Sequence, residues 1–281
     1  MSDFDHDTSR ARQAVKAAQR RGLPVPDEIP AVAAMVDVAV KAAHMPGPER
    51  PTREDVPATA EELAALIEER AHAWRIAQSH HKVATDFLEP LARRFNQLVR
   101  DQVPGWILAL QPEFNGLVKQ LRAQSKKLPA NLDPKWLDWN DSRITSAWEK
   151  AEGIAFQLDQ LVSDRKDMAR AGGLGGEGGR DNELYAVAKL PDPITEGVVQ
   201  HRMRTHIAPE IQQWRDLKHQ PVSRWLQLVR SEHLTIELAT PDEVSQRAAV
   251  RGKWIEAIQV RGVAPVPTPK TIAAIESVLR S

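Results

Sequence analysis

Nine histidines are the first side chains of this chain that could do chemistry, as metal ligands. His72 and His80 share one helix face, but two turns separate them by roughly 12 Å, too far to bind one ion. His80 and His81 diverge by about 100° around a helix axis. His201 and His206 are five residues apart, which is a poor spacing for chelation on one helix. The histidines therefore predict no metal site.

Acidic pairs are the second candidates, because two neighbouring carboxyl groups can act as a general acid and a general base. On charged helices such carboxylates more often face solvent or form an ion pair with a lysine or arginine one turn away. The sequence contains no cysteine, no HExxH and no Gly-x-Ser-x-Gly. We therefore expect no enzyme activity and no metal or other cofactor. The pairs in question are Glu61 with Glu62, Glu68 with Glu69, and Asp138 with Asp141.

A glycine-rich run offers a third chemical possibility, phosphate binding. Six of the eight residues over 172–179 are glycine. A P-loop needs Lys-Ser or Lys-Thr after its glycines and a strand before them, and here neither condition is met. Such a composition does not hold regular structure. We expect residues 171–182 to be a flexible linker or loop.

Composition limits the function classes further. The chain has 281 residues, 42% of them hydrophobic, which suffices for a sizeable core. Its 38 basic and 38 acidic residues cancel, so bulk charge favours neither nucleic acid nor an acidic membrane. No signal-peptide core is expected in the first 30 residues, and the apolar run over 31–36 is too short to cross a membrane. We expect a cytoplasmic protein, or one within a particle assembled in the cytoplasm.

A long charged helix over 59–101 organises the chain. Thr59 and Glu62 form a capping-box pattern at its start. Pro90 predicts a kink near residues 86–89. One apolar stripe runs along the helix and must be buried against other helices, from this chain or a neighbour. It contains Leu63, Ile67, Trp74, Leu88, Leu91, Phe95 and Leu98, with Ala71, Ala77, His81 and Ala84 between them.

Four residues of this stripe are the candidate partner-binding residues: Trp74, His81, Leu88 and Phe95. Aromatic and aliphatic side chains of this kind anchor helical interfaces. His81 has three alternatives at this place: a hydrogen-bonded core histidine, a polar residue that sets helix register, or a metal ligand. The first is the commonest role of a histidine on an apolar face.

The following residues predict a partner for the long helix. We expect a turn at 103–105, a second helix over 113–128, and a third that starts at Asp133 and Pro134 and continues to about Arg170. Together these form an antiparallel helical hairpin or three-helix bundle, a coiled-coil-like arrangement.

The C-terminal part predicts further helices and one small β pair. A strand over 185–190 could pair with the alternating residues 234–238. Thr240, Pro241 and Glu243 give a strong helix start. The expected helices cover residues 192–207, 209–218, a stretch from 221, 241–260 and 269–279.

These elements predict a mainly α-helical fold, a helical hairpin or bundle with a second, smaller helical domain that could contain a two-stranded β pair. Seven prolines between residues 24 and 57 indicate an arm that wraps a neighbour. The predicted divisions are a proline-rich N-terminal arm (1–57), a hairpin domain (58–170), a glycine-rich linker (171–182) and a C-terminal helical domain (183–281).

The function that this organisation favours is a non-enzymatic structural or assembly protein. It would act through helix-mediated contacts with a protein partner or with itself as an oligomer, for instance as a subunit or scaffold of a bacterial or bacteriophage particle. The alternative is a nucleic-acid-binding protein, because residues 200–281 carry twelve basic and eight acidic residues. Its candidate contacts are Arg247, Arg251 and Lys253.

Overall fold

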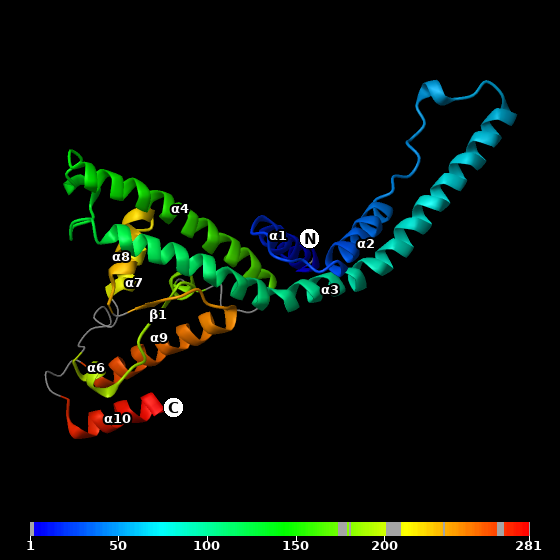
Figure 1. Ribbon diagram of the computed structural model, residues 1–281. Coiled ribbons are helices and arrows are strands. Elements are labelled where there is room, and N and C mark those ends of the chain that lie inside the picture. The colour runs from blue at the N-terminus through cyan, green and yellow to red at the C-terminus, as the bar shows by residue number, and fades with distance from the viewer. Residues whose placement is uncertain are drawn as a thin grey trace.

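The protein is mainly α-helical, with one small antiparallel sheet in its C-terminal part, which confirms the predicted fold class. The computed structural model describes residues 3–173, 179, 181–200, 209–232, 234–262 and 267–280. Figure 1 shows an elongated molecule in which one helix, α3, joins a slender projecting part to a broader helical body.

The central element is α3 (Ala60–Ser125), a single helix of 66 residues. Its length is about 99 Å at 1.5 Å per residue. The capping box at its start is confirmed: the Glu62 N–H donates to the Thr59 hydroxyl at 3.2 Å, and the Thr59 N–H donates to the Glu62 carboxylate at 3.3 Å. The predicted turn at 103–105 and the separate helix over 113–128 are wrong, because α3 continues through both segments.

Three prolines lie inside α3, and packing explains why they do not end it. An internal proline costs about 3 kcal/mol, whereas burying one large apolar side chain contributes about 1.5–3 kcal/mol. The second half of the helix buries many such side chains in the main core, so α3 curves along its middle part instead of breaking (Figure 1). They include Phe95, Val99, Val103, Ile107, Leu110 and Phe114.

The partner of this second half is α4 (Ser142–Ala171), which runs antiparallel to it and completes the predicted helical hairpin. The predicted start at Asp133 and Pro134 is confirmed, since the Asp133 carboxylate accepts the Lys135 N–H at 3.0 Å, but the uninterrupted helix predicted from there to about Arg170 is wrong. Pro134–Trp136 forms only a short 3-10 turn, η2, and α4 begins after Asp141, whose carboxylate accepts the Arg143 N–H at 2.8 Å. Asp138 likewise accepts the Asn140 N–H, at 3.0 Å, so local side-chain bonds hold this connection out of a helix.

Residues 3–43 contain two helices, α1 (Asp3–Arg20) and α2 (Glu28–Ala43), that pack on α3 and α4. Four buried alanines of α1 allow it to lie close to its neighbours: Ala11, Ala14, Ala17 and Ala18. Arg20 and Arg21 then bind the nearly buried Asp164 of α4, each with a contact of 2.6 Å. Residues 44–59, with the short turn η1 (Arg53–Asp55), return the chain to the start of α3.

The C-terminal part packs on the same core through α8 (Pro221–Arg230) and the buried ring of Trp225. This ring makes edge-to-face contacts with Trp214, at 5.2 Å, and with Phe114 of α3, at 6.3 Å between centroids. The predicted β pair is confirmed in a shorter form. It joins β1 (Ala188–Lys189) to β2 (Thr235–Ile236), with Ala188 opposite Ile236. The other elements here are α5 (Asn182–Tyr185) and α7 (Pro209–Asp216).

A second, smaller hydrophobic cluster surrounds Trp254 and Ile275. It is formed by α6 (Thr195–Gln200), α9 (Pro241–Arg261) and α10 (Pro269–Arg280). The predicted cap of α9 is confirmed, since the Thr240 N–H donates to the Glu243 carboxylate at 2.7 Å. Half of the predicted glycine-rich linker (174–178 and 180), and the end of the helix expected over 192–207, lie outside the described residues. Among the helices that are described, none combines the length and the apolar character that a membrane span requires.

Candidate protein-binding site

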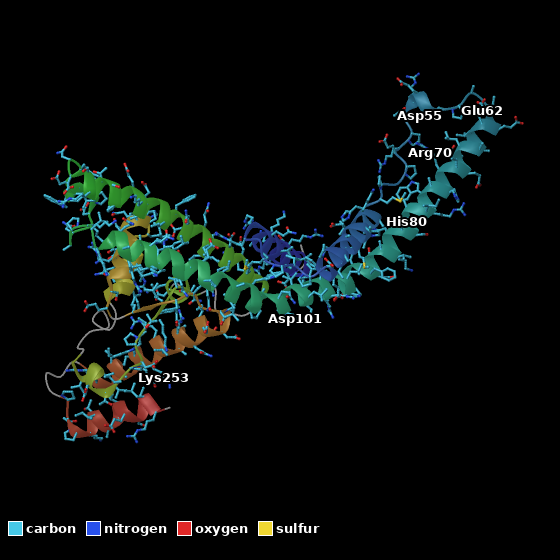
Figure 2. The ribbon with its side chains drawn as sticks, in the orientation of Figure 1. Asp55, Glu62, Arg70, His80, Asp101 and Lys253 are labelled. Carbon is cyan, nitrogen blue, oxygen red and sulfur yellow. The ribbon has the colours of Figure 1, made fainter. Side chains whose placement is uncertain are left out.

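The most distinctive surface of the molecule is the slender part that projects from the body. We call it the distal rod: α2 together with residues 60–91 of α3 and the connection 44–59 (Figures 1 and 2). Its two helices lie antiparallel and bury small or branched side chains between them. The buried residues of α2 are Ile29, Val32, Val36, Ala39 and Ala43, and those of α3 in this part are Ala77 and Ala84.

One side of the distal rod carries an apolar groove, which we call the rod groove. Met35 and Val38 of α2 are 50% and 69% exposed, and Val83 and Phe87 of α3 are 56% and 59% exposed. These four side chains line a depression of about 660 Å³ together with Ala34, Ala39, Ala42, Ser79, His80, Ala84 and Leu91. Monomeric proteins rarely leave a contiguous apolar surface open unless it binds something.

The end of the rod is held together by polar contacts with the connection. Arg70 donates to the Glu49 carbonyl at 2.7 Å, and the ring of Trp74 packs over Gly47. The Thr52 N–H and hydroxyl both donate to the Asp55 carboxylate at 2.8 Å. These bonds stabilise the charged carboxylate and hold the pKa of Asp55 below its ordinary value.

The structure places the four candidate partner-binding residues in different environments. Phe95 is only 1% exposed and lies in the core, with the Arg12 guanidinium 5.8 Å from its ring centre. Leu88 is half-buried, and Trp74 is half-exposed over the connection. His81 donates from Nδ1 to the Ala43 carbonyl at 2.7 Å and so binds the end of α2. Of the four, Trp74 and His81 are the exposed residues.

The residues that form the rod groove are not among those candidates. Val83 and Phe87 each precede a residue of the predicted stripe, Ala84 and Leu88, so they lie at the edge of that helix face. One signal could have found the α2 half. Its sequence is apolar on nearly all sides over 29–40, and a helix of that kind contacts neighbours on more than one face.

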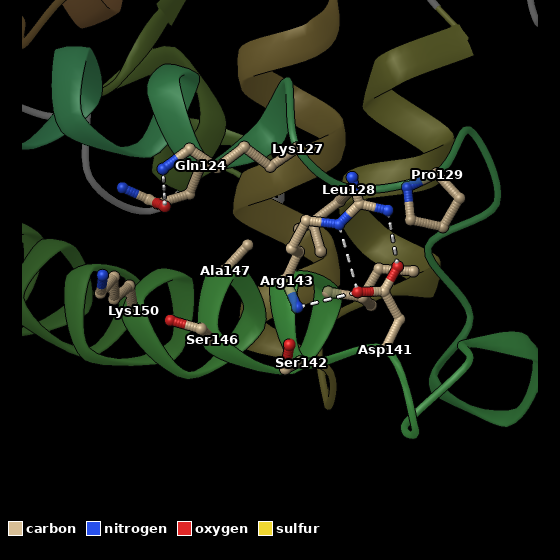
Figure 3. A pocket seen from close by; sticks show the side chains of 11 residues that line it. Gln124, Lys127, Leu128, Pro129, Asp141, Ser142, Arg143, Ser146, Ala147 and Lys150 are labelled. Atoms are coloured by element: carbon tan, nitrogen blue, oxygen red, sulfur yellow. Dashed lines mark hydrogen bonds and ion pairs between the residues drawn. The ribbon is translucent and has the colours of Figure 1, made fainter.

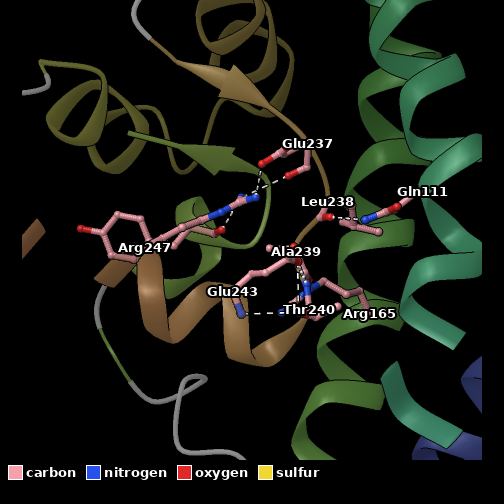
Figure 4. Close-up of polar contacts among 9 residues, drawn as sticks. Gln111, Arg165, Glu237, Leu238, Ala239, Thr240, Glu243 and Arg247 are labelled. Carbon is pink, nitrogen blue, oxygen red and sulfur yellow. Dashed lines mark hydrogen bonds and ion pairs between the residues drawn. The ribbon is translucent and has the colours of Figure 1, made fainter. Parts of the chain in front are cut away.

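The basic residues proposed for nucleic acid do not form one open surface. Arg247 is 5% exposed and donates to the Tyr185 carbonyl at 2.9 Å and to the Glu237 carboxylate at 2.6 Å (Figure 4). Burial lowers the pKa of Arg247 from its ordinary value, and the Glu237 carboxylate opposes that shift. Arg251 and Lys253 are half-buried on α9.

Arg247 belongs to a set of bonds that attach the C-terminal part to the hairpin (Figure 4). Gln111 of α3 donates to the Leu238 carbonyl at 3.0 Å, and Arg165 of α4 donates to the Ala239 carbonyl at 2.8 Å. Arg247 of α9 also donates to the Glu237 carbonyl at 3.3 Å, so the carbonyl groups of segment 237–239 are bound from three helices. Arg247 stabilises this junction and is not available to bind phosphate groups.

Of the groups considered for catalysis and metal binding, His201 and His206 lie outside the described residues. In the part of the chain that the structure describes, no three His, Asp or Glu side chains lie close enough to hold a metal ion. Glu61, Glu62, Glu68 and Glu69 are exposed on α3. The bonds that Asp141 accepts from Arg143 hold the pKa of this carboxyl below its ordinary value, as is typical of a helix cap.

Comparisons with known proteins add no family to this description: no protein-family model matches the chain, and no curated protein or solved structure gave a match.

Proposed function

We propose that the protein is a non-enzymatic assembly protein that pairs with a second copy of itself through the rod groove. The observation that carries this proposal is the exposure of Met35, Val38, Val83 and Phe87, side by side from two helices, on the part of the molecule that projects furthest. Exposed aromatic and aliphatic residues in a depression are typical centres of protein interfaces.

Charge favours a second copy as the occupant of the rod groove. Residues 28–43 and 70–91, which contain the groove, carry four basic and four acidic residues, so two such surfaces do not repel each other. Lys82 and Asp86 lie one helical turn apart on α3, and each directly precedes a residue of the groove, Val83 or Phe87. In an antiparallel pair related by a two-fold axis, Lys82 of each copy would lie near Asp86 of the other. Such self-complementarity is what a two-fold interface requires.

This pairing would form a four-helix bundle from two distal rods, with the two bodies at opposite ends. Four-helix bundles pack around a core of apolar side chains from the facing helices, as the rod groove would supply. A subunit or scaffold of a bacterial or bacteriophage particle remains the setting that we propose for it.

The solution mass tests the proposal. We expect twice the 31.4 kDa of one chain by light scattering at moderate salt, and at least this mass at low salt, because an apolar contact is not weakened by salt screening. A monomer at all accessible concentrations would overturn it. The ultraviolet absorbance of the same sample tests the nucleic-acid alternative. That alternative predicts nucleic acid that stays bound to the protein at low salt and is lost at moderate salt.

A further inference from the structure

An open cleft lies at the other end of α3, where this helix and α4 are joined. We call it the hairpin cleft (Figure 3). It has a volume of about 770 Å³ and is lined by the cations Lys127, Arg143 and Lys150 and by the apolar residues Leu128, Pro129 and Ile144. Pockets of roughly 300–1,000 Å³ hold ligands of many atoms, so the cleft has room for several side chains.

The hairpin cleft keeps a positive charge although one of its cations is paired. Arg143 binds Asp141 at 3.2 Å, whereas Lys127 and Lys150 are exposed. The surrounding residues 119–150 carry seven basic and four acidic residues. Trp136, in the connection between the two helices, is 76% exposed. Trp136 does not line the cleft itself. An apolar cleft with a basic rim fits a partner that is both acidic and apolar.

The end of the distal rod has the opposite character. Residues 44–69, which we call the acidic tip, carry seven acidic and two basic residues. Leu63 and Ile67 lie one turn apart on α3 and are 43% and 57% exposed. Glu61, Glu68 and Glu69 are exposed on the same two turns. The acidic tip therefore presents apolar side chains within a negatively charged surface.

We propose that the acidic tip of one copy docks in the hairpin cleft of another copy. The two surfaces lie near opposite ends of α3, a helix about 99 Å long, so the tip of a chain cannot reach its own cleft. A contact between two different surfaces of the same chain does not close on itself at two copies, and it extends into a row unless the geometry forms a ring. This contact uses neither side of the rod groove and goes beyond the proposed function.

A single-stranded nucleic acid is the other ligand that basic and aromatic residues attract. The chemistry of the cleft favours the tip, because its lining includes Leu128, Pro129 and Ile144, which match the exposed Leu63 and Ile67. Association through this contact should weaken as salt rises, since both rims are exposed and charged.

Two sets of substitutions test the contact from its two sides. The tip variant is Glu61→Gln/Glu68→Gln/Glu69→Gln, which leaves the capping residue Glu62 unchanged. The cleft variant is Lys127→Gln/Lys150→Gln, which leaves the bonded pair Arg143 and Asp141 unchanged. A matched control, Glu152→Gln/Glu256→Gln, removes exposed carboxylates elsewhere. All are made in full chains that also carry Phe87→Glu, so that pairing through the rod groove does not contribute.

The parent chain with Phe87→Glu should form species heavier than a monomer at low salt, with a mass that rises with concentration. For each variant alone, the dissociation constant of this contact should rise by up to about tenfold, as expected when several exposed ion pairs are removed together. A mixture of the two variants should form a one-to-one complex and nothing larger. The tip variant keeps an intact cleft and the cleft variant an intact tip, so one productive contact remains. The control should behave like the parent.

The proposal is overturned if the parent stays monomeric at low salt, if both variants associate like the parent, or if the mixture forms no complex while circular dichroism shows both variants folded. Loss of the assembly on treatment with nuclease would also overturn it, because nucleic acid would then occupy the cleft. None of these outcomes depends on the rod groove, so the two proposals fail separately.

Discussion

The Nδ1 atom of His81 lies 2.7 Å from the carbonyl oxygen of Ala43, so a side chain of α3 binds the last residue of α2. The last carbonyl groups of a helix have no partner within it and need one from elsewhere. His81 supplies such a partner and thereby fixes the end of α2 beside the rod groove.

Replacing His81 with alanine should lower the free energy of unfolding by about 1 kcal/mol, the usual contribution of one hydrogen bond. The loss should be local, so the amides at the end of α2 should exchange faster with deuterium in hydrogen-exchange measurements. His72→Ala is the matched control, because His72 is exposed on the same helix. Equal protection of α2 in both variants would contradict the assigned role.

Asp164 should contribute more than His81 to the free energy of unfolding, because its nearly buried carboxylate joins α1 to α4. Arg20 and Arg21 both donate to its carboxylate at 2.6 Å. Asp164→Ala leaves the largely buried Arg21 without this partner, and we expect a loss of about 2–3 kcal/mol in chemical denaturation. Asp167→Ala provides the comparison. Its contacts to arginine are longer, at 3.6 and 4.0 Å, and it should cost less than about 1 kcal/mol.

The elements with local start signals could be predicted from the sequence. Thr59 and Glu62 start α3, and Thr240 and Glu243 start α9, because a capping box acts within four residues. The extent of α3 could not be predicted in the same way. Pro104 and Pro112 argue locally for a break, and only the packing of the helix in the core, through residues far away in sequence, outweighs them.

The candidate site could be predicted only in part, for a related reason. Periodicity identified the face of α3 that meets α2, and Phe95 on that face is buried, as a regular apolar stripe implies. Periodicity does not show where the covering helix ends. The rod groove, with Val83 and Phe87, arises at the edge of the covered face, and its other half comes from α2. The role of Arg247 also depends on distant partners, Tyr185 and Glu237.

Tyr185 provides a test of stability against pH, and it is the only tyrosine of the chain. Burial raises its pKa to about 12, and the Asp181 carboxylate adds to the shift. An unfolded tyrosine has a pKa of about 10, so between about pH 10 and 12 the unfolded state releases this proton first. Stability should therefore fall by about 2 kcal/mol across that interval.

The ultraviolet absorbance of tyrosinate follows this titration directly. In Tyr185→Phe the fall in the free energy of unfolding between about pH 10 and 12 should be smaller by about 2 kcal/mol. The stability at neutral pH should change little. Identical alkaline unfolding of the two proteins would show that Tyr185 titrates normally in the folded state.

Phe87 is the most direct test of pairing through the rod groove. Phe87→Glu replaces a 59% exposed ring in the groove with a charge. A two-fold pair contains two such rings, each contributing about 1.5–3 kcal/mol when buried, so the dissociation constant should rise at least about 100-fold. Sedimentation or light scattering over a concentration series measures this change.

Phe156→Glu is a closely matched control for that variant. Phe156 is 62% exposed, almost the same as Phe87, but it lies on α4 in the body. Both substitutions add one carboxylate and remove one exposed ring, so they alter solubility and net charge equally. If pairing occurs through the rod groove, only the variant at Phe87 loses this pairing, and at moderate salt it becomes monomeric. If both variants weaken association equally, the effect comes from net charge, and the contact lies elsewhere.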